Sequence, residues 1–335
     1  MGAIKGVGKG AVATIIENRR KEKYQNIFDL VKKVDLRAAN KKTLENLALA
    51  GGFDSFDKTH RAQYFNPDGD GIIFLEKVIR FGARYQESLN SAQTTLFGEQ
   101  SEEVYQELII PNAPEWQNLE QLKREKEVVG IYLSGHPLDD FKKEMHWFTN
   151  GVLANLKDLK PLVNKNINVA GIINDFEFLE SKNGKQWCKF TLEDFSEQYE
   201  FRIFGEEFLK FKHFININQF VRLKLNIRDG WRNQETGRIG DPRIQFLSFE
   251  MLHEAINNNS KKLTLKFDIR KLQAERILSL KNELNRFKGD KPLCFDIIDS
   301  EKSLKLTLNS RKQKVSISPE LLDHLENNDW VYKLN

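Results

Sequence analysis

The sequence predicts a multidomain α+β protein, with a helical module first, a β-barrel next and a small α/β domain last. Two observations predict this fold class. Apolar residues follow the helical period of 3.6 in the first part of the chain, and from about Ile167 the period changes to 2, which is typical of strands. The length of 335 residues leaves room for about two to four domains with buried cores.

The composition excludes several classes of protein. The chain has no run of 18 apolar residues and no signal-peptide pattern, so we expect neither a membrane span nor export. Its two cysteines, Cys188 and Cys294, are far apart and its six histidines are scattered, so neither a zinc site nor a disulfide framework is expected. This cysteine usage fits a reducing cytoplasm.

The start of the chain has the pattern of a helix-hairpin-helix. Apolar Ile4 is followed by Gly6-Val7-Gly8 and then by a helical stretch that reaches Ile16. Two glycines allow a turn with positive φ and let a phosphate approach with no Cβ in the way. The next helix would point its free N–H groups at that phosphate, while Val7 locks the turn from inside. A Gly-rich helix start of another kind remains open, but a nucleotide P-loop is disfavoured because no G-K-[ST] follows.

Positive charge is concentrated around this hairpin. Residues 1–50 contain eleven Lys and Arg against five Asp and Glu, whereas the net charge of the whole chain is only +4. Such a local field attracts the phosphates of nucleic acid, although a basic helix face can also be plain solvated surface. The candidate DNA-binding residues of the hairpin are Lys5, Gly6, Gly8, Lys9, Gly10, Arg19 and Arg20.

A second, degenerate hairpin is predicted in residues 24–53. Asn40 is the expected N-cap of its second helix, and Gly51-Gly52 is the expected stop. Residues 1–56 are therefore expected to form a tandem helix-hairpin-helix module that binds DNA.

Residues 57–160 are predicted to be a helical segment with a linker. Amphipathic helices are expected over residues 72–89 and 116–133, the second ending at Gly135 with Pro137 as the stop. The polar stretch between the two helices lacks periodicity and is expected to be a loop.

That loop, residues 91–98, carries a candidate peptide motif. Gln93 is followed by Leu96 and Phe97, which gives an apolar anchor with a hydrogen-bonding handle in a polar segment. A short peptide of this kind docks into a surface pocket of a partner protein. The alternative is that Leu96 and Phe97 fold back onto the core of this chain.

Residues 161–252 predict an OB-fold barrel. An Asn-Gly hairpin turn is expected at residues 181–185, and a helix over 206–214 is expected between the third and fourth strands. The five strands are expected over residues 167–173, 186–192, 199–204, 220–227 and 244–247.

Aromatic and cationic residues interleave along these strands, as they do on surfaces that bind single-stranded nucleic acid. Because side chains alternate along a strand, about half of them would point into the barrel. The candidate contacts to single-stranded DNA are Trp187, Lys189, Arg202, Arg228, Trp231 and Arg243.

The last segment, residues 261–335, predicts a small α/β domain that follows the polar linker 257–260. Some of its segments follow the helical period of 3.6 and others follow the strand period of 2. The expected elements are a strand over 263–267, a helix over 270–287, strands over 293–298, 304–308 and 314–317, and a helix over 319–326.

Two acidic patterns suggest metal chemistry as an alternative. Asn66–Gly71 looks like the start of a calcium loop, but Lys77 stands where the bidentate Glu is required, so we expect a turn. Asp54, Asp57 and Asp139 are the metal ligands of a rival hypothesis, a metal-dependent DNA nuclease built on the hairpins. A third hypothesis is a free-standing OB-fold accessory protein that binds nucleic acid.

Several longer runs of the sequence resemble one protein family. They are Gly2–Ala11, Asn40–Leu47 with Ala50–Asp54, Gln93–Phe97, Glu125–Asp139 and Val169–Ile172. In these runs the chain resembles the bacterial replicative DNA polymerase III alpha subunit, strongly over residues 1 to about 250 and weakly over 260–335. The run Tyr-Leu-Ser-Gly-His-Pro-Leu-Asp, which ends at Asp139, is the most specific of them.

The resemblance implies a role for each part of the chain. The hairpin pair would grip duplex DNA behind the polymerase, and Gln93, Leu96 and Phe97 would form the internal motif that binds the sliding clamp (beta). The OB domain would meet the single-stranded template. Residues 261–335 would contact the tau subunit of the clamp loader.

The catalytic part of the family is not expected in this chain. In the family, the palm with its metal-binding aspartates lies upstream of this region, and no Asp-x-Asp strand motif is present here to hold two Mg²⁺ ions. The resemblance therefore implies a C-terminal fragment of a nucleotidyltransferase, from a split or truncated gene. We expect no catalytic residues, no metal or other cofactor of its own, no polymerase activity when alone, and a cytoplasmic location.

Overall fold

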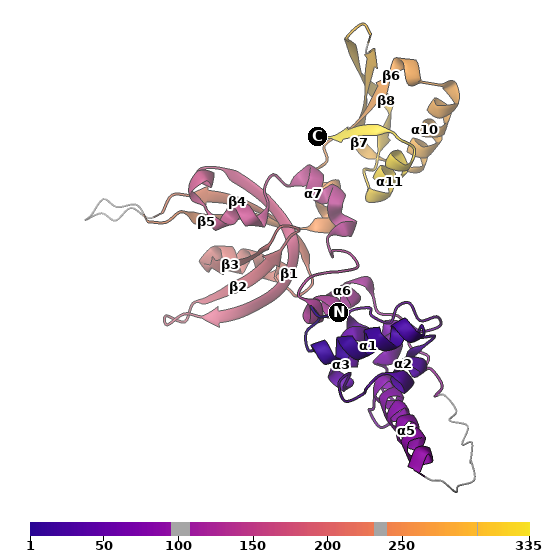
Figure 1. Ribbon diagram of the computed structural model, residues 1–335. Coiled ribbons are helices and arrows are strands. Elements are labelled where there is room, and N and C mark those ends of the chain that lie inside the picture. Colours follow the sequence, from indigo (N-terminus) through magenta and orange to yellow (C-terminus); the bar gives the residue numbers. More distant parts are fainter. Residues whose placement is uncertain (95–107, 231–239, 300) are drawn as a thin grey trace. The chain divides into compact units, whose positions relative to one another are not determined.

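The structure, a computed structural model, describes residues 1–94, 108–230, 240–299 and 301–335 (Figure 1). It divides into two compact units, Met1–Pro137 and Leu138–Asn335. The first unit is helical and the second contains two sheets, so the predicted mixture of helices and sheets is confirmed. Within the described ranges, no helix combines the length and apolar character that crossing a membrane requires. The finer division into four domains stays a prediction.

The first unit contains two helical hairpins followed by longer helices. Its helices are α1 (Lys9–Lys21), α2 (Ile27–Lys33), α3 (Lys41–Leu49), α4 (Arg61–Tyr64), α5 (Phe74–Thr94) and α6 (Asn118–Val129). The side chain of Asn40 accepts a hydrogen bond from the amide of Thr43 (3.0 Å), as expected of the predicted N-cap. Gly51, with a φ of +79°, follows α3 as the predicted stop.

Both hairpins share one apolar core. Val7, Ala11 and Ile15 of the first hairpin belong to the same buried cluster as Phe28 and Leu44 of the second. The inward position predicted for Val7 is thus confirmed. The shared cluster makes the two hairpins one packed body.

The ends of α5 and α6 differ from the prediction. Helix α5 extends to Thr94, because residues 90–94 contain no Gly or Pro to stop it, so the predicted loop 91–98 is helical in its first four residues. Helix α6 ends at Val129 rather than near Gly135. Gly130 adopts the left-handed φ of +88° and provides the cap five residues earlier.

A buried ion pair holds α4 against α6. The guanidinium of Arg61 donates to Oε1 of Glu125 (2.6 Å) and to both oxygens of Asp54, and Glu125 is completely buried. Oε2 of Glu125 also accepts from the backbone amides of Leu133 (3.2 Å) and Ser134 (3.0 Å). Glu125 therefore joins three segments of the unit.

The second unit begins with a five-stranded antiparallel sheet. Its elements are α7 (Lys142–Phe148), β1 (Asn166–Glu180), β2 (Gln186–Glu193), β3 (Gln198–Phe204), α8 (Gly205–Phe211), β4 (Phe220–Arg228), β5 (Arg243–Met251) and α9 (Ala255–Asn259). The predicted turn between β1 and β2 is confirmed, because Gly184 adopts a φ of +71° and the amide of Ser181 donates to the carbonyl of Lys185. Strand β1 runs past Ile173, the predicted end, to Glu180. After a register shift between Ile173 and Asp175, its second part is half-exposed and pairs with β2.

The strand order of this sheet is β3-β2-β1-β4-β5. In the described part of the chain β3 and β5 do not pair, so the sheet is open and the predicted barrel stays a prediction. Buried aromatic side chains fill the space beneath it. Phe201 of β3 and Phe246 of β5 lie 5.7 Å apart between ring centroids.

The second unit ends in a mixed four-stranded sheet of order β8-β7-β6-β9. Its elements are β6 (Leu263–Asp268), α10 (Ala274–Arg286), β7 (Lys288–Asp299), β8 (Leu304–Val315), α11 (Pro319–Asn327) and β9 (Val331–Leu334). Helices α10 and α11 pack against one face of the sheet (Figure 1). Strand β8 covers two strands of the prediction, which were separated because the exposed, polar middle of β8 has no apolar pattern. The short strand β9 was not predicted.

Candidate nucleic-acid interface

The first hairpin turn is held rigidly against α3. Gly6 adopts a φ of +73°, as the predicted turn requires. Its carbonyl accepts a hydrogen bond from Oγ1 of Thr43 (3.1 Å), and the carbonyl of Lys5 accepts one from Nδ2 of buried Asn46 (2.5 Å). The turn is therefore preorganised by the second hairpin.

The start of α1 has the electrostatics of an anion site. Gly8 is its N-cap residue, no side chain caps its first amides, and its first turn contains no acidic residue. Free N–H groups and the positive end of the helix dipole attract a phosphate at such a helix start.

Gly8 and Gly10 are not required by the fold. Gly8 has an ordinary φ of −76°, so of the two predicted turn glycines only Gly6 uses positive φ. A Cβ on Gly8 would meet nothing within 4 Å, and one on Gly10 would touch only the methyl of Ala38, at 3.9 Å. Gly10 lies inside α1, where Gly is unfavourable relative to Ala, whereas Gly8 is at the N-cap, where Gly is common.

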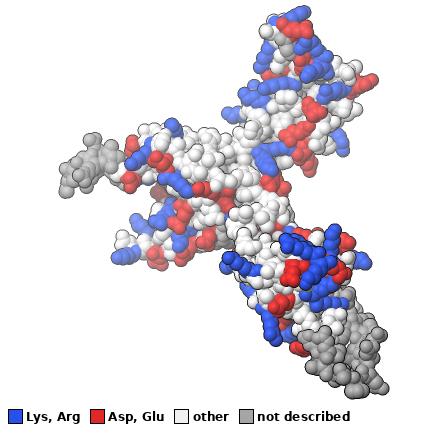
Figure 2. All heavy atoms as spheres, in the orientation of Figure 1, with Lys and Arg blue, Asp and Glu red and all other residues white. Residues whose placement is uncertain are grey.

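Exposed lysines surround this helix start. Lys5, Lys9 and Lys42 are exposed, and none has a side-chain partner among the described residues. A Cβ built on Gly6 would lie 3.8 Å from Cγ of Lys42, which places Lys42 beside the first turn. Lys42 was missed from the sequence, although its place in the first turn of a basic helix is a usable signal. Figure 2 shows Lys and Arg side chains gathered over α1, with acidic side chains among them.

Arg19 and Arg20 lie at the other end of α1, in its last turn. At 1.5 Å per residue, they are about 15 Å along the helix from Lys9. The structure thus separates these two arginines from the other predicted hairpin residues. At that end their positive charges interact favourably with the negative end of the helix dipole and stabilise the helix.

The predicted docking motif lies mostly outside the described residues. Gln93 is in the last turn of α5, where the backbone alone is described. Leu96 and Phe97 fall outside the described ranges. Their role stays a prediction.

Three of the predicted OB-domain residues share the outer face of β2 and β3. Trp187 stacks on Phe204, with ring centroids 5.0 Å apart, and Lys189 pairs with Arg202 in the strand register. Lys189 binds Glu177 (2.7 Å) and Arg202 binds Glu200 (2.9 Å), so acids compensate both cations.

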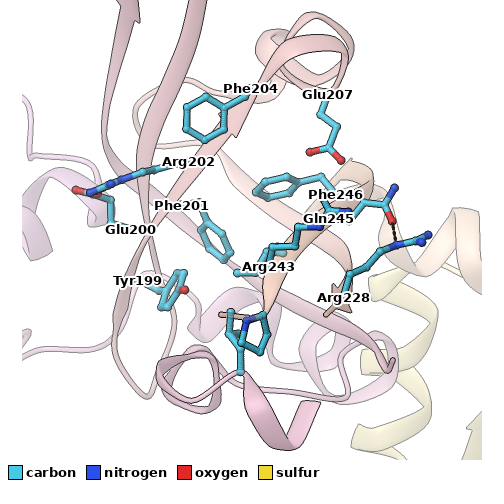
Figure 3. Close-up of a pocket in the computed structure, with 13 residues that line it drawn as sticks. Tyr199, Glu200, Phe201, Arg202, Phe204, Glu207, Arg228, Arg243, Gln245 and Phe246 are labelled. Atoms are coloured by element: carbon cyan, nitrogen blue, oxygen red, sulfur yellow. Dashed lines mark hydrogen bonds and ion pairs between the residues drawn. The ribbon is translucent and has the colours of Figure 1, made fainter. Parts of the chain in front are cut away.

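The other two described residues of the predicted set, Arg228 and Arg243, line a groove between β3 and β5 with a volume of about 760 Å³, and Arg202 lines it as well (Figure 3). Nε of Arg228 donates to Oε1 of Gln245 (2.6 Å). Arg243 lies beside Glu207. Burial raises the pKa of the Glu207 carboxyl, and the backbone amide of Phe246 and the charge of Arg243 partly offset this rise. Trp231 is outside the described ranges.

Asp54 and Asp139 of the nuclease hypothesis, and Asp68 of the calcium-like pattern, have local partners. Both carboxylate oxygens of Asp54 bind Arg61, and Asp139, in the other unit, pairs with Lys142 (2.7 Å). Asp68 accepts from the amides of Asp70 and Ile72, so the predicted turn at Asn66–Gly71 is confirmed. Among the described residues, no group of three or more His, Cys, Asp or Glu side chains is placed to hold a metal ion.

Two segments of the chain match known family models. Residues 1–64 match the helix-hairpin-helix motif, and residues 263–335 match the C-terminal domain of the DNA polymerase III alpha subunit. The chain is related to the C-terminal part of DNA polymerase III subunit alpha. The predicted hairpin module and the predicted family resemblance are confirmed.

Curated relatives agree with the family models. DNA polymerase III subunit alpha of Pseudomonas fluorescens is 28% identical over 307 residues, which cover 88% of this chain and 25% of the relative. The protein of the same name from Buchnera aphidicola is 32% identical over 231 residues, which cover 68% of this chain and 19% of the relative. The chain thus spans a quarter or less of the length of these relatives.

Solved structures add no argument about the fold. RecG bound to a three-way DNA junction aligns with a TM-score of 0.20 and 16% identity, over 72% of this chain and 31% of that one. So low a score does not support a fold assignment.

Proposed function

We propose that this chain is the non-catalytic, DNA-holding part of a replicative polymerase of the DNA polymerase III subunit alpha type. In this role it binds the phosphates of duplex DNA, the single-stranded template and the sliding clamp. The relationship to subunit alpha and the basic hairpin module support the proposal.

One observation carries the duplex-binding function. Gly8 and Gly10 stand at an uncapped helix start where neither backbone conformation nor packing needs glycine. Their absent Cβ atoms leave the first amides of α1 open to a phosphate, and three exposed lysines lie around them. Because phosphates carry no base identity, the binding is expected to be independent of sequence.

The double variant Gly8→Ala, Gly10→Ala tests this function. We expect the free energy of unfolding to change by no more than about 1 kcal/mol, since both sites have room for a methyl group. Affinity for duplex DNA should fall by about tenfold or more, because a hydrogen bond to a charged phosphate is lost. Fluorescence anisotropy with two 20-base-pair duplexes of unrelated sequence at low salt measures it. Unchanged affinity, or binding to one sequence only, contradicts the proposal.

The first sheet of the second unit is proposed to be an OB-fold domain that binds single-stranded template. The strand order β3-β2-β1-β4-β5 and the helix α8 between β3 and β4 support this proposal. Exposed aromatic and cationic side chains on β2 and β3 also support it. Preference for RNA over single-stranded DNA would instead favour the accessory-protein hypothesis.

The segment from Gln93 to Phe97 is proposed to bind the sliding clamp. The triple variant Gln93→Ala, Leu96→Ala, Phe97→Ala is expected to weaken clamp binding by about 30-fold, the loss typical of a hot-spot anchor. Duplex DNA binding should remain as in the original chain, because the hairpins are untouched. Surface plasmon resonance on immobilised clamp measures the loss. A triple variant that still binds the clamp with full affinity rules the motif out.

Residues 261–335 are proposed to contact the tau subunit of the clamp loader, and the chain is proposed to act in the cytoplasm. The match of residues 263–335 to the C-terminal domain model supports the assignment of this segment. Co-elution of tau with the full chain, lost on deletion of residues 261–335, would test it.

A further inference from the structure

The four-stranded sheet of the second unit has two edges of very different length. Strand β9 forms one edge and has four residues, and so short a strand leaves little backbone for another chain to pair with. Strand β8 forms the other edge and has twelve residues. In the part of the chain that the structure describes, no strand pairs with the outer side of β8. The backbone N–H and C=O groups on that side are a template for a further strand.

The straight part of this edge is Leu304–Asn309. These six residues pair in unbroken register with Asp299 to Cys294 of β7, whereas the register shifts beyond Asn309. A register shift bends a strand and ends regular pairing there. All six residues are exposed, and six residues are the usual length of a strand in a sheet. We call this stretch the free β8 edge.

The polar face of the free β8 edge is already occupied by contacts to β7. Lys305 binds Asp296 (2.8 Å), and Oγ1 of Thr307 donates to Oδ1 of Asp296 (2.6 Å). Sγ of Cys294 donates to Oδ1 of Asn309 (3.0 Å). An unpaired lysine often protects an edge strand against pairing, but Lys305 is held by the neighbouring strand.

The opposite face of the free β8 edge is an exposed row of leucines. Leu304 is 62% exposed, Leu306 56% and Leu308 44%. Their neighbours on β7 include Ile297 opposite Leu306 and Phe295 opposite Leu308, and both are half-buried. A strand with apolar side chains at every second position would cover this row and pair with it across the edge.

The residues that follow the free β8 edge are basic. Arg311, Lys312 and Lys314 are exposed, and none of them has an ionic partner among the described residues. Strand β8 contains four Lys and Arg and no Asp or Glu. A second copy of β8 is therefore a poor occupant of the edge, because both strands would bring only cations to the contact. Acidic residues complement these charges.

We propose that the free β8 edge binds an extended segment of a partner protein, which adds a fifth strand to the sheet. The segment carries apolar residues at every second position, which cover the leucine row, and acidic residues beside Arg311 and Lys312. Its backbone groups pair with those of Leu304–Asn309, as in other cases of strand addition to a sheet edge. The proposal does not depend on the proposed contact with tau, because it names the chemistry of a segment and not a partner.

Binding of a synthetic peptide to the full chain tests this assignment. The probe is the fluorescent peptide Glu-Asp-Glu-Val-Thr-Val-Thr-Val-Thr-Glu-Asp-Glu, and fluorescence anisotropy at low salt measures its affinity. The control peptide has Lys at every acidic position. We expect the control peptide to bind at least about tenfold more weakly, because its cations would face those of β8.

Two variants of the chain test the side chains of the edge. Leu306→Thr should weaken binding of the acidic peptide by about tenfold, because apolar burial is lost while threonine still favours a strand. The double variant Arg311→Ala, Lys312→Ala should weaken binding by about fivefold and make it less sensitive to salt.

Matched controls lie at the opposite edge of the same sheet. Val331 on β9 is 59% exposed, so Val331→Thr makes a similar change away from the free β8 edge. Lys333 on β9 and Lys261, whose amide donates to the carbonyl of Asn335, are exposed cations there. Val331→Thr and the double variant Lys261→Ala, Lys333→Ala should each change affinity by less than about twofold. Urea unfolding of every variant checks that the domain still folds.

Two N-methylated peptides test whether the backbone pairs. One acidic peptide is methylated on the amides of its three valines and the other on those of its three threonines. Because alternate N–H groups of a strand point to opposite sides, only one of these sets faces β8. We expect one methylated peptide to lose at least about tenfold in affinity and the other to keep most of it.

Each outcome supports or overturns the assignment. If the acidic peptide does not bind, or binds no more tightly than the lysine peptide, the proposed chemistry of the segment is wrong. If Leu306→Thr binds as tightly as the original chain, or if the controls at the β9 edge lose more, the site is not at the free β8 edge. If the two methylated peptides bind alike, no strand is added to the sheet.

Discussion

Replacement of Glu125 by alanine is expected to lower the free energy of unfolding of the first unit by about 3–5 kcal/mol, the usual cost of breaking a buried ion pair. The substitution leaves Arg61 buried without one of its two carboxylate partners. It also removes the acceptor of the amides of Leu133 and Ser134. Hydrogen exchange of peptides from residues 1–137, followed by mass spectrometry, measures the loss in this unit alone.

Glu120→Ala is the matched control for this prediction. Glu120 lies on the same helix, and its pair with Arg124 (2.8 Å) is exposed. Its removal is expected to cost no more than about 0.5 kcal/mol. Equal losses in Glu120→Ala and Glu125→Ala would show that burial of the Glu125 pair does not matter.

The same carboxylate makes the stability of the first unit depend on pH. Burial acts to raise the pKa of Glu125, but hydrogen bonds from Ser134 and Arg61 outweigh it, so this pKa lies below its ordinary value. A carboxyl with a lowered pKa stabilises the folded state above the ordinary pKa, and this contribution is lost as the pH falls through the folded-state pKa. The first unit should therefore lose stability in acid, and Glu125→Gln should show a smaller loss over that range.

Neutralisation of Lys5, Lys9 and Lys42 together is expected to weaken duplex DNA binding on the order of 100-fold at low salt. The three lysines are exposed around the start of α1 and have no partners among the described residues. Each would release one counterion on binding a phosphate. The triple alanine variant should therefore lower the slope of log affinity against log salt by about 2.7. Anisotropy titrations from about 50 to 200 mM salt cover the range in which this slope is measured.

A second triple variant on the same helix is the control for charge alone. Arg19→Ala, Arg20→Ala, Lys21→Ala removes the same net charge from the last turn of α1. Because these residues lie far along the helix from the turn, we expect a slope change of less than about 1. If both triple variants lose affinity equally, binding depends on the overall field of the unit, and the hairpin turn is not the phosphate site.

The sequence predicted the local parts of the candidate interface. The turn at Gly6, the inward position of Val7 and the N-cap at Asn40 each depend on residues a few positions apart. Glycine spacing, apolar period and capping residues report such short-range structure directly. The same holds for the Asn-Gly turn that ends at Lys185.

The ends of helices and strands were predicted less well than their presence. The end of α6 moved from Gly135 to Gly130, since two glycines lie within six residues and either can cap a helix. The continuation of β1 past Ile173 was missed, because the register shift between Ile173 and Asp175 moves the apolar alternation from odd-numbered to even-numbered positions, so it does not continue the earlier pattern.

The sequence by itself determined that this chain carries a hairpin module with a glycine-rich helix start, two sheet-bearing segments after it, and a relationship to subunit alpha. Only the tertiary structure decided that Lys42 joins the hairpin turn, that Arg19 and Arg20 do not, and that Arg61 binds Glu125, 64 residues away. Likewise, only the packing of β3 opposite β5 brings Phe204 and Arg228 to one groove. The physical reason is the same in each case. Contacts between distant residues arise from burial of a shared core, and they leave no period or spacing in the chain that a reader of the sequence could detect.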